Sequence, residues 1–147
     1  GAARADESPA AAPAAAARRA LVADDNVDAA QSLAMLLQLE GCEVRVVHDG
    51  EAAVRVAAEF RPDVIFMDVG MPVLDGLDAT RRIRRQPWGR EPRIHALTGW
   101  GQEADRERSR EAGVDRHLVK PIDPGVLAEL LAEVGTPRPA AAPGAGA

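Results

Sequence analysis

Three carboxylates, a hydroxyl and an amine stand at the ends of short apolar runs in this chain. Asp24 and Asp25 follow ALVA, Asp68 ends VIFMD, Thr98 ends IHALT, and Lys120 ends HLVK. Neighbouring carboxylates repel one another, and a hard divalent cation such as Mg²⁺, which takes oxygen ligands, is the usual remedy. A lysine and a hydroxyl beside that cation, with a carboxylate as nucleophile, are suited to phosphoryl transfer through an aspartyl-phosphate.

These side chains can act together only if the chain brings the ends of the runs to one place. The apolar runs read as strands over residues 20–25, 42–48, 63–68, 93–98 and 115–120. Segments with helical spacing or composition follow each run, and in the last of them Asp123 caps the helix with Pro124 in its first turn. Five such strand–helix units predict a parallel sheet with helices on both faces.

The pattern of apolar and polar residues in the strands also predicts their order in the sheet. Residues 42–48 alternate apolar and polar side chains, as an edge strand with one solvated side does. Residues 63–68 are almost continuously apolar, as a central strand is. We therefore expect an α/β fold of the flavodoxin-like (βα)5 type, a doubly wound parallel sheet in strand order 2-1-3-4-5. Ligands of such sheets bind at the carboxyl ends of the strands, where the five side chains converge.

Composition sets the domain boundaries and argues against some partners. Residues 1–17 and 136–147 are mostly Ala, Pro and Gly, so we expect disordered linkers or tails around one folded domain over residues 18–135. A net charge of -5 argues against nucleic-acid contact by this domain. No apolar run approaches the roughly 20 residues that span a bilayer, so no membrane contact is expected. The single cysteine, Cys42, fits a reducing, cytoplasmic setting.

Four motifs resemble the signature of the response-regulator receiver domain. They are ADDN, MDVGMPVLDG, ALTG and VKP, and they occur in the family's order over about residues 19–134. The resemblance implies that Asp68 is the phosphoacceptor and that Mg²⁺ is the cofactor. It further implies that Asp25 and Asp68 bind the metal directly, that Asp24 acts through water, and that the carbonyl of Gly70 is another ligand.

The resemblance also assigns the switch and the partners. Thr98 is implied to be the switch hydroxyl, and Lys120 is implied to bind the phosphoryl group, with a cis peptide before Pro121. His117 stands where the family often has Tyr or Phe, so a switch role and a plain edge-strand role are both open. The expected phosphodonor is a histidine kinase or histidine phosphotransfer domain. A downstream protein would read the face formed by the fourth helix, fifth strand and fifth helix.

Other interpretations stand beside this one. A haloacid-dehalogenase-like phosphatase also uses a strand-end Asp with Mg²⁺, but it needs a second Asp where this chain has Gly70. A pseudo-receiver would dock without phosphorylation. Asp24 and Asp25 could simply cap the first helix. The texture of the later motifs also resembles receiver domains attached to hybrid histidine kinases.

Overall fold

The computed structural model describes residues 18–71, 73–99 and 106–134. The strands are β1 (Arg19–Ala23), β2 (Glu43–Val47), β3 (Val64–Asp68), β4 (Arg93–Thr98) and β5 (Arg116–Val119). The helices are α1 (Val27–Leu39), α2 (Gly50–Phe60), α3 (Gly76–Arg84), α4 (Arg106–Ala112) and α5 (Pro124–Glu133). The predicted tails, residues 1–17 and 136–147, lie outside the described residues, as do residues 102–105 of the predicted fourth helix.

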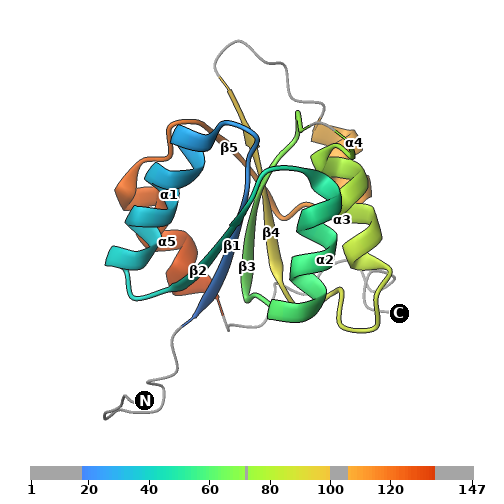
Figure 1. The fold of residues 1–147 in the computed structure, drawn as a ribbon, viewed down its shortest axis with the longest axis horizontal. Coiled ribbons are helices and arrows are strands. Elements are labelled where there is room, and N and C mark those ends of the chain that lie inside the picture. Colours follow the sequence, from blue (N-terminus) through green and yellow to red (C-terminus); the bar gives the residue numbers. More distant parts are fainter. Residues whose placement is uncertain (1–17, 72, 100–105, 135–147) are drawn as a thin grey trace.

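The strands form one parallel sheet in the order β2-β1-β3-β4-β5, which confirms the predicted topology. Figure 1 shows α1 and α5 over one face of the sheet and α2, α3 and α4 over the other. β1 and β3 are neighbours, so the loops that follow them share the carboxyl edge. β5 ends at Val119, which places Lys120 immediately after the strand rather than at its last position.

Two aliphatic clusters hold the sheet between its helices. One joins β1, β3, β4 and β5 to the inner faces of α1 and α5, with Leu37, Phe66 and Leu127 among its buried members. The other joins the opposite face of the sheet to α2 and α3, with Ile65 and Ile83 buried in it. All five residues of β3 are buried, as expected of the central strand of a doubly wound sheet.

Side chains at the first residue before each helix fix where four of the helices begin. Asn26, Asp49, Asp75 and Asp123 each accept a backbone N–H from three residues further along the chain. Asn26 therefore caps α1, and the alternative that Asp24 or Asp25 serves as this cap is wrong. Both carboxylates remain available at the edge of the sheet.

In the part of the chain that the structure describes, we find no helix long and apolar enough to cross a membrane. Cys42 is buried immediately before β2, and burial raises the pKa of its thiol.

Candidate functional site

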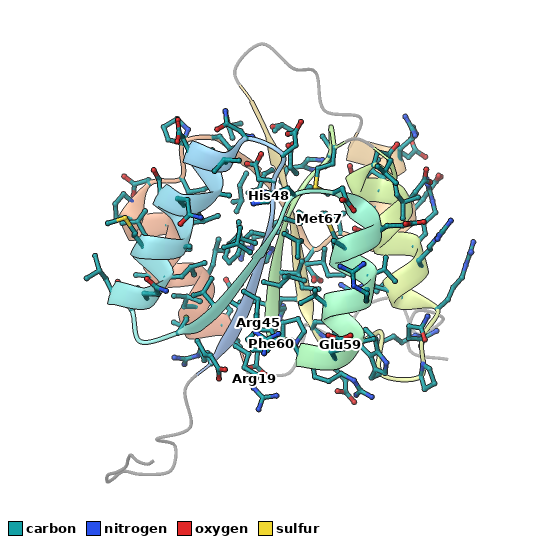
Figure 2. All side chains as sticks on the ribbon, viewed as in Figure 1. Arg19, Arg45, His48, Glu59, Phe60 and Met67 are labelled. Carbon is teal, nitrogen blue, oxygen red and sulfur yellow. The ribbon has the colours of Figure 1, made fainter. Side chains whose placement is uncertain are left out.

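The predicted carboxylates lie together at the carboxyl edge of the sheet. One oxygen from each of Asp24, Asp25 and Asp68 can be chosen so that all three lie within 4.8 Å of one another. Asp24 and Asp68 are 1% and 5% exposed, whereas Asp25 is open to solvent. Figure 2 labels His48 and Met67 near this edge, and Arg19, Arg45 and Phe60 near the opposite edge.

Short backbone contacts set the position of each carboxylate. Asp24 Oδ1 accepts the N–H of Asn26 at 2.9 Å, which links the acidic turn to the start of α1. Asp68 Oδ1 accepts the N–H of Gly70 at 3.2 Å. Gly76, the first residue of α3, packs directly under the phosphoacceptor candidate, because a Cβ there would lie 2.2 Å from the carbonyl oxygen of Asp68. The site is thus built on two strand ends and two helix starts.

Lys120 brings the positive charge that the sequence predicted. Its Nζ lies 3.0 Å from Asp24 Oδ2 and 3.8 Å from Asp68 Oδ2. The peptide bond between Lys120 and Pro121 is cis, as the family resemblance implied. One ammonium facing three carboxylates leaves the cluster with excess negative charge.

The ionisation of Asp68 reflects its burial first and the neighbouring negative charge second. Burial raises the pKa of Asp68 from 3.8 to about 6, and the neighbouring Asp24 carboxylate acts in the same direction. The N–H of Gly70 and the ammonium of Lys120 act to lower this pKa, without cancelling the effect of burial. A cation placed among the carboxylates would favour the ionised form.

The oxygen-rich cluster fits a hard divalent cation. Three carboxylates can each offer an oxygen to one point, and Mg²⁺ prefers oxygen ligands and usually retains waters. The arrangement is therefore compatible with Mg²⁺. The carbonyl of Gly70 as a further ligand remains a prediction.

Thr98 and His117 lie on the neighbouring strands β4 and β5. Thr98 is 3% exposed, and its hydroxyl donates to the carbonyl of Leu118 at 3.4 Å. His117 is half-buried, and its Nε2 lies 2.8 Å from Oγ of Ser109 in α4. His117 thus contacts α4 from the edge strand β5, and its switch role remains a prediction.

Two residues near these groups escaped the sequence reasoning. His48 Nδ1 lies 2.9 Å from the carbonyl of Asp24, beside the acidic turn. Because His48 directly follows β2, and β2 neighbours β1, the strand-end argument could have placed it there. Ser109 carries no comparable signal, since a serine within a polar helical run is ordinarily solvent-exposed.

Comparison with known proteins identifies the domain. Residues 20–132 match the model of the response regulator receiver domain. The chain is 42% identical over 116 residues to the transcriptional regulatory protein PrrA of Mycobacterium tuberculosis, a match covering 79% of this chain and 48% of that protein. The chain thus spans about half the length of the curated relatives it matches.

Solved structures agree with the family match. The receiver domain of sensor histidine kinase PA1611 from Pseudomonas aeruginosa PAO1, with a magnesium ion coordinated in its active site cleft, is 39% identical, with a TM-score of 0.74 over 81% of this chain and 98% of that chain. The chemotaxis response regulator CheY4 of Vibrio cholerae is 30% identical, with a TM-score of 0.71 over 80% and 98% of the two chains. Because the family match runs from β1 into α5 and so includes the whole carboxyl edge, this chain belongs to the response regulator receiver domain family of two-component signalling.

Proposed function

We propose that this domain accepts a phosphoryl group on Asp68 from a phosphohistidine and signals through the face formed by α4, β5 and α5. The observation that carries the proposal is the cluster of Asp24, Asp25 and Asp68 with Lys120 Nζ at 3.0 and 3.8 Å from two of the carboxylates. As a family, receiver domains accept phosphoryl groups from histidine kinases and act on downstream effectors. The donor proposed here is a histidine kinase or a histidine phosphotransfer domain.

Each residue of the site has a distinct task in this proposal. Asp24, Asp25, Asp68 and the carbonyl of Gly70 would hold Mg²⁺, with Asp24 acting through water. When bound, Mg²⁺ supplies positive charge that offsets the charge on the phosphoryl oxygens. Lys120 follows β5, and its ammonium lies beside Asp24 and Asp68, where it would also face the phosphoryl oxygens.

The bonds that change in the transfer belong to the carboxylate and the donor. An oxygen of Asp68 attacks the phosphorus in line with the bond to the donor's imidazole nitrogen. A phosphorus–oxygen bond forms while the phosphorus–nitrogen bond breaks, and its electron pair stays on the imidazole. Thr98 follows Leu97, which is in register with Asp68, and in this proposal its hydroxyl turns toward the new phosphoryl group.

Entry to the site suits a macromolecular donor. Asp25 and Gly70 are exposed beside the buried Asp68. A groove of about 470 Å³ leads from Asp24 and Lys120 along α1. A donor protein could therefore present its phosphohistidine at the open edge of the sheet. An origin from a hybrid histidine kinase is a further proposal, which the similarity to the PA1611 receiver domain supports.

The two rival functions lose support at particular residues. A haloacid-dehalogenase-like phosphatase needs an acid/base carboxylate two residues after its nucleophile, where Gly70 offers none. A pseudo-receiver has no need for three clustered carboxylates and a lysine, all of which are present here.

Phosphorylation with acetyl phosphate tests the proposal. Incubation with acetyl phosphate and Mg²⁺, followed by intact-mass measurement, should show one added phosphoryl group. Asp68→Asn should abolish this addition, whereas Asp28→Asn, which changes an exposed carboxylate of α1, should leave it unchanged. Undiminished labelling of the Asp68 variant would place the nucleophile elsewhere, and sustained hydrolysis of a generic phosphate ester would favour the phosphatase.

A further inference from the structure

The helix α4 is held to the sheet by unusually small side chains. Among its residues with described side chains, 107–112, only Ser109 and Ala112 are buried, at 2% and 3% exposure. A surface helix normally packs a stripe of larger apolar side chains against the core. Two small residues bury little apolar area, so specific polar contacts weigh more in placing this helix than they do in α1 or α5.

One such contact reaches the middle of α4 from β5. Oγ of Ser109 and Nε2 of His117 lie 2.8 Å apart, a short hydrogen bond between a buried hydroxyl and a half-buried ring. A second set of contacts fixes the end of the helix. Arg84 of α3 donates to the carbonyl of Gly113 at 3.0 and 2.9 Å and pairs with Asp115 at 3.0 Å. The Ser109–His117 bond thus ties the middle of α4 to β5, while the Arg84 contacts hold its end.

His117 is also placed next to the residue expected to move. Ala96 is in register with His117, and Thr98 is in register with Val119. Side chains in register, and those two positions apart, share a face of a sheet, so Thr98 and His117 lie on the same face. The hydroxyl of Thr98 donates to the carbonyl of Leu118, the residue that follows His117. Turning this hydroxyl toward a phosphoryl group on Asp68 would release that carbonyl.

We infer that the Ser109–His117 hydrogen bond is the connection through which the position of Thr98 reaches α4. The inference rests on the proposed function, because it takes phosphorylation of Asp68 as the event that moves Thr98. In this inference Ser109 is a positioning residue. The position of Thr98 is coupled to that of α4 through a hydrogen bond, whose strength depends on its geometry. In the unphosphorylated protein the Ser109–His117 hydrogen bond keeps α4 packed against β5. This bond is lost when the Thr98 hydroxyl turns toward the phosphoryl group.

Amide hydrogen exchange of α4 tests the inference in the full chain, with Mg²⁺ plus beryllofluoride as the phosphoryl mimic. In the wild type the mimic should accelerate exchange of α4. Ser109→Ala should accelerate it without the mimic by about two- to ten-fold, since a hydrogen bond contributes about 0.5–1.5 kcal/mol and about 1.4 kcal/mol is tenfold. The mimic should then cause no further change.

A matched pair at His117 separates the hydrogen bond from side-chain size. His117→Gln keeps an amide group within reach of Ser109 and should behave like the wild type, whereas His117→Met has similar length without a polar group and should behave like Ser109→Ala. Equal behaviour of the two His117 variants, or a full response to the mimic in Ser109→Ala, would overturn the inference. A thermal shift on adding the mimic reports binding at Asp68 separately. A wild type without that shift would refute the proposed function, and the inference with it.

Discussion

Replacing Asp68 by Asn should make the metal-free protein more stable at neutral pH. Asp68 is 5% exposed and lies beside Asp24, so its negative charge is unfavourable in the folded state. An Asn keeps the shape and can still accept the N–H of Gly70, but it carries no charge. The substitution therefore removes the proposed nucleophile and, at the same time, stabilises the metal-free protein.

The magnitude follows from the raised pKa. A carboxyl whose pKa is 3.8 unfolded and about 6 folded binds its proton more tightly when folded, so the protein loses stability as pH rises through this window. With about 1.4 kcal/mol for each pKa unit, the loss is small near pH 4 and approaches about 3 kcal/mol at pH 7.5. Asn should recover up to this amount, in which the attraction between Asp68 and Lys120 is already included, because Lys120 is one of the groups that set the pKa of Asp68.

Urea unfolding of both proteins, followed by far-ultraviolet circular dichroism in the presence of a chelator, measures the difference. The advantage of Asp68→Asn should grow from pH 4 to pH 7.5 and shrink when Mg²⁺ is added, because the cation would stabilise the wild type by mass action. As a control, Asp28→Asn in the first turn of α1 should lower stability slightly at neutral pH. A difference in unfolding free energy between Asp68→Asn and the wild type that does not vary with pH would show that the buried charge of Asp68 does not destabilise the fold.

Three further changes test other parts of the site and its support. Asp25→Ala should remove any rise in melting temperature with millimolar Mg²⁺ and raise the stability of the metal-free protein, as thermal denaturation with and without Mg²⁺ would reveal. Gly76→Ala should cost about 1–3 kcal/mol in urea unfolding, because its Cβ would lie 2.2 Å from the carbonyl oxygen of Asp68. Arg84→Met should cost about 3 kcal/mol by the same assay, because it removes the ion-pair partner of the largely buried Asp115 carboxylate and a donor to several carbonyls, and an unchanged midpoint would contradict this.

The site could be predicted because its residues occupy the ends of strands. In a parallel sheet the direction of every strand is the same, so a residue type that follows an apolar run must appear at one edge. That single rule predicts that Asp24, Asp68, Thr98 and Lys120 share one edge of the sheet. The strand order needed only the contrast between the alternating residues 42–48 and the continuous apolar run at 63–68.

The sequence was less informative where contacts depend on tertiary packing rather than on the periodic spacing of apolar residues. Both Asp24 and Asn26 are residue types that cap helices, and only the backbone conformation of Asn26 made it the cap of α1. Ser109 sits in a run of charged residues that predicts a solvated helix face, yet it is 2% exposed. A long charged side chain cannot be buried next to the half-buried His117, whereas a small hydroxyl that hydrogen-bonds to the ring can.

The burial of Asp68 is consistent with the chemistry proposed for it. A carboxylate in water is strongly hydrated and a poor nucleophile, and burial removes part of that hydration. Burial also favours the protonated form, which cannot attack, so the two effects oppose each other. With a pKa of about 6, Asp68 is still mainly ionised at pH 7.5, because the N–H of Gly70 and the ammonium of Lys120 limit the rise. The site therefore holds a partly dehydrated yet charged carboxylate, and a cation bound beside it would remove much of the remaining cost.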